Sequence, residues 1–342
     1  MILPNELPRF EREAFQRALH DGMVVETSGS IAKPKRVRLS AVALRASAEA
    51  TTGAIGSGNW VLALPLTYIA GIMVVVRSLV DDTELVDLRA EPFDAAKFSA
   101  AVTNLRAGTW FTSLVPAQLA RLVDLGESAR AAFTRFGAIL VGGQAIPAGL
   151  VDRATALGAR VIRTYGSAET SGGVVYNGRP IGDTKLRITD DGVLEVSTSS
   201  LASGYLDDPG GTASSFVDGW FRTSDLAHFE HGALVIDGRV DDIIVTGGVK
   251  VSIADIERVL AESGIDAVAT WYVDEEWGQV PAVVSTAELD LDAIRSRVGV
   301  TLGKAARPYR VARVDAIPRL TSGKVDRHAV QQFISQATRP NL

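Results

Sequence analysis

A repeated alternation of short apolar segments with helical segments, between residues 61 and 163, limits the fold more than any other feature of the sequence. Short strands that alternate with helices form a parallel sheet covered by helices on both faces. We therefore predict an α/β fold. The expected strands are 61–64, 84–88, 109–114, 138–141 and 160–163, and the expected helices are 41–52, 70–79, 94–106, 117–125 and 148–157, after an amphipathic helix within 1–22.

The texture changes after Gly172, where apolar residues alternate around Gly and Asp turns. This pattern predicts a small antiparallel β part, with strands at 174–176, 185–188, 193–196 and 234–236. The polar joint 238–242 precedes a new unit, which has a strand at 243–245, a helix at 253–262, two strands, a helix, a strand ending at Val314 and a last helix at 326–336. We expect a large N-terminal domain over 1–240, with a reduced N-terminal region, and a small mobile α+β domain over 241–342.

Charge and composition exclude several classes of protein. The formal net charge of −5 argues against a general nucleic-acid-binding surface, so local basic groups must hold any anionic ligand. The chain has no cysteine, which excludes disulfides and thiolate chemistry and fits a cytoplasmic location. Pro65 and Gly71 interrupt the apolar run 60–76, so we expect a buried strand, a turn and a buried helix instead of an integral membrane span. The sequence leaves open whether the protein forms a homo-oligomer.

Polar residues and glycines follow several of the expected strands. Ligands of parallel sheets bind at the carboxyl ends of strands, so these residues are candidates for a ligand site. They are Thr67-Tyr68, Ser113, Gly142-Gly143 and Tyr165-Gly166-Ser167.

Residues 27–35, Thr-Ser-Gly-Ser-Ile-Ala-Lys-Pro-Lys, form a loop rich in hydroxyl groups and lysines. Such a loop can turn N–H, hydroxyl and ammonium groups toward a polyphosphate. It is not a Walker A loop, because Pro34 stands where the second glycine would fall. Taken alone, the segment is equally compatible with a solvated hairpin loop.

Two acidic residues stand in motifs that suit a nucleotide. Glu169, in Tyr-Gly-Ser-Ala-Glu-Thr, offers an oxygen ligand of the type that Mg²⁺ accepts beside phosphates, and Tyr165 offers a flat ring for a base. Asp225, just past an aromatic strand, can hold the two hydroxyls of a ribose. The alternatives are an ordinary turn with a solvated glutamate and a strand end whose aspartate begins a turn.

Two basic residues complete the set. Arg239, in Gly-Arg-Val-Asp-Asp, can reach a ribose or a phosphate, unless it forms an interdomain salt bridge with a neighbouring aspartate. Lys324 follows a glycine in Thr-Ser-Gly-Lys, which gives a loop that carries one ammonium group, although most such lysines are simply exposed.

Taken in order, these motifs and the intermediate segment 192–205, with Gly204-Tyr205, resemble the acyl-adenylate-forming superfamily of AMP-binding enzymes. The resemblance extends over roughly residues 24 to 328. Segments 64–73, 77–79 and 113–119 are further similar to the o-succinylbenzoate–CoA ligase family of menaquinone biosynthesis.

The resemblance implies a ligase that uses ATP, Mg²⁺ and CoA to activate a small carboxylic acid as acyl-AMP and to pass the acyl group to the CoA thiol. Lys324 and Glu169 would be catalytic, Glu169 as a metal ligand, and Asp241 would be a hinge. The nucleotide would contact Thr27, Ser28, Gly29, Ser30, Lys35, Gly142, Gly143, Tyr165, Gly166, Ser167, Thr170, Asp225 and Arg239; the acyl group would contact Tyr68, Gly71, Arg77 and Ser113; and the CoA tunnel would contain Gly247, Gly248 and Lys250.

The sequence departs from the family pattern in two places. Ile31-Ala32 stand where Thr-Gly is usual, and Tyr68 stands where His is common. Two alternatives stay open: another aryl- or acyl-CoA synthetase, and a degenerate protein that binds acyl-AMP without turnover, which the altered loop at Ile31-Ala32 motivates. Arg77 is a candidate for recognising a second carboxylate of the substrate, and the alternative is an arginine whose head reaches the surface.

Overall fold

The computed structural model describes residues 9–27, 35–90, 92–147, 149–319 and 325–336. Its largest sheet has the strand order β4-β3-β5-β6-β7-β8-β9. The pairs from β4 to β7 are parallel, as predicted, and β8 and β9 are added antiparallel at one edge. The strands are β3 (Asn59–Leu62), β4 (Leu85–Asp87), β5 (Trp110–Leu114), β6 (Phe136–Gly142), β7 (Val161–Ser167), β8 (Gly172–Tyr176) and β9 (Arg179–Pro180).

Helices cover both faces of this sheet because successive strand residues point to opposite sides. In β3, Trp60 and Leu62 join one buried cluster while Val61 joins another. The first cluster lies under α1 (Arg9–Asp21), α2 (Ala41–Ile55) and α3 (Ile69–Val80), and the second under α4 (Ala95–Thr103), α5 (Pro116–Val123), α6 (Arg130–Phe133) and α7 (Leu150–Ala156), with η1 (Gly126–Ala129) beside α6. Ser40 caps α2, as predicted, because its hydroxyl accepts a bond from the N–H of Ala43.

The edge of the large sheet corrects two details of the prediction. β8 was expected in the small antiparallel part, but it pairs with β7. Residues 165–167 were expected to follow the strand, but β7 continues through Ser167 before the short turn η2 (Ala168–Thr170) reverses the chain. The side chains of this motif therefore belong to the end of a strand that lies between β6 and β8.

Two smaller antiparallel sheets lie beside this edge. One contains β10 (Lys185–Ile188), β11 (Val193–Ser197), β13 (Phe216–Val217), β14 (Trp220–Glu230) and β15 (Ala233–Arg239). The other contains β1 (Met23–Glu26), β2 (Arg36–Leu39) and β12 (Gly204–Tyr205), with α8 (Pro209–Ser215) following β12. Thr27 and Lys35 close the β1–β2 hairpin, since the N–H of Thr27 donates to the carbonyl of Lys35 at 2.9 Å.

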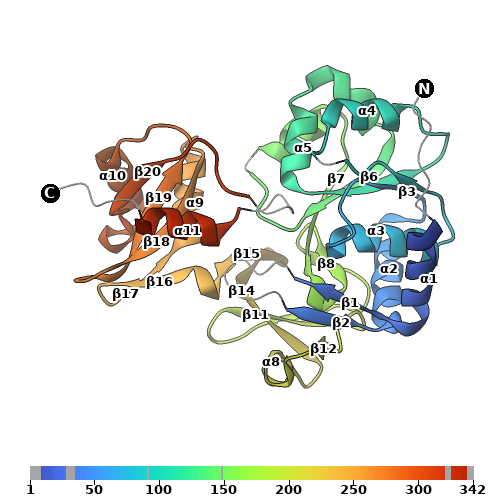
Figure 1. The fold of residues 1–342 in the computed structure, drawn as a ribbon, viewed down its shortest axis with the longest axis horizontal. Helices are drawn as coiled ribbons and strands as arrows, with labels where there is room; N and C mark the ends of the chain where they lie inside the picture. The colour runs from blue at the N-terminus through green and yellow to red at the C-terminus, as the bar shows by residue number, and fades with distance from the viewer. Residues whose placement is uncertain (1–8, 28–34, 91, 148, 320–324, 337–342) are drawn as a thin grey trace.

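The elements after the short turn η3 (Val240–Asp242) have a core of their own and are grouped at one end of the molecule (Figure 1). Their sheet has the order β17-β16-β19-β18, and β20 pairs with β19. The elements are β16 (Ile243–Thr246), β17 (Val249–Ser252), α9 (Ile253–Glu262), β18 (Ala267–Asp274), β19 (Gly278–Ser285), α10 (Leu291–Leu302), η4 (Lys304–Ala306), β20 (Arg310–Arg313) and α11 (Arg327–Gln336). As predicted, Ser252 caps α9 and one face of α9 is buried.

Candidate nucleotide and acyl site

Glu169 lies in the η2 turn, and backbone hydrogen bonds of the neighbouring Thr170 hydroxyl fix the shape of this turn. The buried hydroxyl of Thr170 accepts a hydrogen bond from the N–H of Ser167 at 2.9 Å and donates to the carbonyl of Gly172 at 2.7 Å. A Cβ at Gly166 would lie 2.0 Å from that carbonyl oxygen, so only glycine lets the two strands approach. Thr170, predicted among the nucleotide contacts, thus has its hydroxyl committed to the backbone that holds Glu169.

A buried tyrosine links Glu169 to the stem of the 27–35 loop. The hydroxyl of Tyr205 donates to Oε1 of Glu169 at 3.1 Å and accepts from Nζ of Lys35 at 3.4 Å. Burial, with Glu169 adding to it, raises the pKa of Tyr205, so its phenol stays protonated and able to donate. From the sequence, Gly204-Tyr205 was expected only as part of a family motif, without a role of its own.

Three residues predicted to contact the nucleotide, Tyr165, Asp225 and Arg239, contact one another at a second point of the site. The hydroxyl of Tyr165 donates to Oδ2 of Asp225 at 2.5 Å, and Nη1 of Arg239 lies 3.5 Å from Oδ1 of the same carboxylate. Burial raises the pKa of Asp225, against the opposing effects of Tyr165 and Arg239. Arg239 also donates to Asp241 at 3.1 Å, so the predicted hinge residue already has a partner beside the site.

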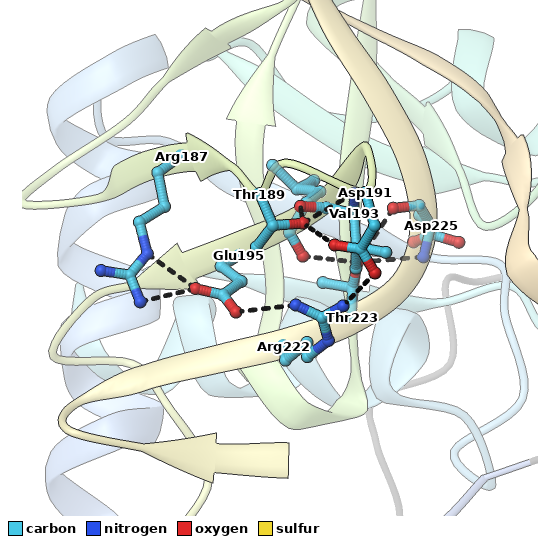
Figure 2. A network of polar contacts seen from close by, with 9 residues as sticks. Arg187, Thr189, Asp191, Val193, Glu195, Arg222, Thr223 and Asp225 are labelled. Atoms are coloured by element: carbon cyan, nitrogen blue, oxygen red, sulfur yellow. Dashed lines mark hydrogen bonds and ion pairs between the residues drawn. The ribbon is translucent and has the colours of Figure 1, made fainter. Parts of the chain in front are cut away.

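Asp225 was expected just past a strand, but it lies within β14, which a polar network holds in place (Figure 2). The hydroxyl of Thr223 accepts from the N–H of Asp225 at 3.0 Å and donates to the carbonyl of Leu194 in β11 at 2.8 Å. Next to it, Arg222 bonds to Asp191 and to Glu195. These contacts fix β14 against β11 and therefore limit where the carboxylate of Asp225 can lie.

Arg77 lies inside the protein. Its residue is 3% exposed, so the alternative in which it reaches the surface is wrong. Nε donates to the hydroxyl of Thr51 at 3.2 Å, and the guanidinium lies 5.2 Å from the ring centroid of Trp60. Over the described ranges of the chain, no Asp or Glu forms an ion pair with Arg77, and burial lowers the pKa of its guanidinium. A Cβ at Gly172 would lie 3.9 Å from its Nη2, which puts this cation next to the strand that follows the Glu169 turn.

Glycines near the sheet's carboxyl end permit close backbone approach. A Cβ at Gly71 would lie 2.3 Å from the carbonyl oxygen of Pro65, and one at Gly142 would lie 2.3 Å from Oγ1 of Thr164. Gly143 has a φ of +84°, a conformation that favours glycine.

The remaining predicted residues fall in several places. Tyr68 precedes α3, Ser113 is buried in β5, and Gly247, Gly248 and Lys250 belong to the β16–β17 hairpin. Ser28, Gly29, Ser30 and Lys324 lie outside the described residues. The hydroxyl of Ser167 is buried, and no described residue hydrogen-bonds to it.

The donor set suits a magnesium ion that arrives with phosphates. Mg²⁺ at nucleotide sites takes one or two carboxylates and completes its shell with phosphate oxygens and water. Glu169 supplies one such carboxylate beside the hairpin stem at Lys35. Within the described part of the chain there is no group of three His, Asp or Glu residues that could hold a metal by itself.

The parallel sheet with antiparallel strands added at one edge defines an α/β fold of the kind that adenylate-forming enzymes have. More specifically, residues 23–205 match the family described as AMP-binding enzyme, and the chain belongs to that family.

Relatives and solved structures agree with this assignment. The chain is 38% identical to the Mycobacterium tuberculosis (strain H37Rv) protein named probable 2-succinylbenzoate–CoA ligase, over 92% of this chain and 85% of that protein. It is 30% identical to the 2-succinylbenzoate–CoA ligase of Geobacillus sp. (strain WCH70), over 95% of this chain and 72% of that protein.

Among solved structures, o-succinylbenzoate CoA synthetase (MenE) of Bacillus subtilis shares the fold, with a TM-score of 0.80 at 23% identity, covering 94% of this chain and 70% of that chain. A variant of Escherichia coli MenE with bound OSB-AMS has a TM-score of 0.75 at 25% identity, covering 92% and 69%. No helix in the described residues is both long and apolar enough to cross a membrane.

Proposed function

We propose that this protein is an ATP-dependent acid–CoA ligase that activates 2-succinylbenzoate as an acyl-adenylate and transfers the acyl group to CoA, a step of menaquinone biosynthesis. The structural observation that carries the choice of acid is Arg77, a buried cation without an acidic partner among the described residues, beside the turn that bears Glu169. The named relatives support the same substrate. We expect the reaction to occur in the cytoplasm, where ATP and CoA are available.

In the first half-reaction, a carboxylate oxygen of the acid attacks the α-phosphorus of ATP. The bond from that phosphorus to the bridging oxygen breaks, and pyrophosphate leaves with its electron pair. Two anions must approach, so fixed positive charge has to offset their repulsion. We assign this role to Lys324 at the reacting groups and to Lys35, with Thr27, Ser28, Gly29 and Ser30, at the departing phosphates. Glu169 would hold a magnesium ion, which would supply further neutralisation of the phosphate charge.

The nucleoside would be held at the second contact point. Asp225, fixed by Tyr165 and Thr223, would accept hydrogen bonds from the ribose hydroxyls, and Arg239 would lie at the ribose edge. The ring of Tyr165 would border adenine, and Gly142-Gly143 would let the base approach the backbone. The hydroxyl of Ser167, to which no described residue hydrogen-bonds, would bond to the α-phosphate or the acyl oxygen.

The acid would lie between the nucleotide turn and α3. One carboxylate reacts and the other stays charged, and the guanidinium of Arg77 would pair with the second one. Such a pair explains why a buried cation is tolerated, since an uncompensated charge in the interior is costly. Tyr68, Gly71 and Ser113 would line the remaining pocket.

In the second half-reaction, the CoA thiol attacks the acyl carbonyl carbon, and AMP leaves. We propose that residues 241–342 rotate about Asp241 between the two steps, which would exchange the 3.1 Å contact between Arg239 and Asp241 for others. The β16–β17 hairpin, with Gly247, Gly248 and Lys250, would then border the CoA tunnel.

The test is mass spectrometry of the products from the purified protein with Mg²⁺, ATP, CoA and 2-succinylbenzoate. The proposal expects 2-succinylbenzoyl-CoA, AMP and pyrophosphate, with acyl-AMP accumulating when CoA is left out. A parallel panel of aryl and medium-chain acids tests the substrate, and a clear preference for one of them would make the protein a different acyl-CoA synthetase. ATP binding without pyrophosphate release for any acid would instead favour a binding protein without turnover.

A further inference from the structure

We infer that Tyr205 is a positioning residue that holds Lys35 and Glu169 around one triphosphate–magnesium site and keeps these two side chains from pairing with each other. The inference rests on the proposed nucleotide site and adds a residue to it. Its basis is the phenol oxygen, which accepts from Nζ of Lys35 at 3.4 Å and donates to Oε1 of Glu169 at 3.1 Å.

The backbone around Tyr205 contacts both the β1–β2 hairpin, whose loop ends at Lys35, and the turn that bears Glu169. β12 pairs with β2, the strand that follows the 27–35 loop, with Tyr205 opposite Val37. Three residues earlier, the N–H of Ala202 donates to the carbonyl of Glu169 at 2.8 Å. Residues 202–205 therefore set the spacing between the β1–β2 hairpin and the Glu169 turn. Tyr205 is the residue of this segment whose side chain contacts both.

The ring itself is held in place. Tyr205 is 7% exposed, and its ring meets Phe216 edge-on with 5.7 Å between centroids. Its N–H donates to the hydroxyl of Thr212 at 2.8 Å. Gly204 has a φ of +126°, and a Cβ there would lie 2.4 Å from Thr212, so a glycine is needed just before the tyrosine. A side chain fixed on this many sides loses little freedom when a ligand binds.

The opposite charges of Lys35 and Glu169 explain why a group between them, the Tyr205 hydroxyl, is useful. A lysine and a glutamate about 4 Å apart near a protein surface attract each other by several kcal/mol before solvation costs, so a free pair would tend to close. A closed pair would remove the ammonium from the phosphates and the carboxylate from the metal. Lys35 and Glu169, both among the described residues, form no ion pair with each other, and each bonds to the phenol oxygen instead.

The experiment compares the binding of Mg·ATP and of AMP to the full-length protein by calorimetry, without acid or CoA. Tyr205→Phe removes the hydroxyl and keeps the ring. AMP lacks the β- and γ-phosphates, so we expect Mg·ATP affinity to fall about tenfold, as for the loss of about 1.4 kcal/mol, while AMP affinity changes less than about twofold. Tyr309→Phe, which removes a hydroxyl in the C-terminal part, is the matched control and is expected to change neither.

A double-mutant cycle with Lys35→Met sharpens the result. Because both changes act on one arrangement, we expect the double variant to lose clearly less Mg·ATP affinity than the sum of the single losses. Equal losses for AMP and Mg·ATP, unchanged Mg·ATP binding, or additive effects would each overturn the inference. If Tyr205→Phe lowers the stability of the protein, the comparison of Mg·ATP with AMP still holds, because both affinities are measured on the same folded fraction of the variant. Failure of the unsubstituted protein to bind either nucleotide would instead refute the proposed function.

Discussion

Tyr165 and Asp225 share a hydrogen bond of 2.5 Å that joins β7 of the large sheet to β14 of a small antiparallel sheet. The bond does two things at once. It satisfies a largely buried carboxylate, whose pKa burial raises, and it fixes the edge of the tyrosine ring. The same oxygen pair thus couples the proposed base-binding ring to the proposed ribose-binding carboxylate.

Tyr165→Phe should therefore raise the KM for ATP. The phenylalanine keeps the flat ring but leaves Oδ2 of Asp225 without its donor, which favours the protonated carboxyl and lets the side chain move. We expect an increase of about tenfold, the scale of about 1.4 kcal/mol, with little change in the KM for the acid. Steady-state pyrophosphate release measures both constants. An unchanged KM for ATP would mean that Thr223 and Arg239 suffice to hold Asp225.

Arg77→Ala should act on one class of acid. Hydrogen bonds to charged groups contribute about 1.5–3 kcal/mol, so the KM for dicarboxylates should rise at least about tenfold, while acids with a single carboxylate should be nearly unaffected. Arg77→Lys, which keeps the charge but loses the fork of donors, should fall between. The measurement is ATP–pyrophosphate exchange with both classes. A uniform loss for both would assign Arg77 to structure.

Local signals predicted much of the fold. Ser40 and Ser252 were expected as helix caps, and α9 was expected to bury one face, because a capping hydroxyl and a helical period act within a few residues. The order of strands and helices followed for the same reason. Local pattern did not place β8, because the choice of pairing partner depends on where the η2 turn sends the chain.

The site was predictable as a set of residues but not as a set of contacts. Asp225 lies 60 positions from Tyr165, and nothing in either motif indicates that the ring's hydroxyl bonds to that acid. Tyr205 was missed for a similar reason, since its partners come from two other segments. Arg77 was left with two alternatives because a helical pattern shows which face is apolar but not whether a cation on it is enclosed.

Lys324→Ala should separate the two half-reactions. Removing one preorganised charge from a transition state costs about 10²-fold in rate, so acyl-AMP formation should fall by about that factor. Thioester formation from preformed acyl-AMP should be spared, because the α-phosphate bond has already been made. Lys304→Ala, in the η4 turn, is the matched control. Equal losses in both half-reactions would rule out the assigned role.

The ion pair between Glu257 and Arg327 should stabilise the C-terminal part. Arg327 donates to both carboxylate oxygens, at 3.2 and 3.0 Å, and the N–H of Ala269 donates to the same carboxylate at 3.0 Å. Both side chains are about a quarter exposed, so solvent weakens the pair. We expect Arg327→Met to lower the free energy of unfolding by about 1–3 kcal/mol, measured by urea denaturation. In a cycle with Glu257→Gln, the double variant should lose less than the sum.

The pH dependence of that loss follows from the sign of the pKa shift. Burial raises the pKa of Glu257 above its ordinary value even with Arg327 present, and removing the cation raises it further. A carboxyl whose pKa is higher in the folded state than in the unfolded state favours folding at low pH and loses that advantage as pH rises through the folded value. The stability difference between the unsubstituted protein and Arg327→Met should therefore be smaller at pH 5 than at pH 8. A difference that is constant, or larger at pH 5, would show that Glu257 does not sense Arg327.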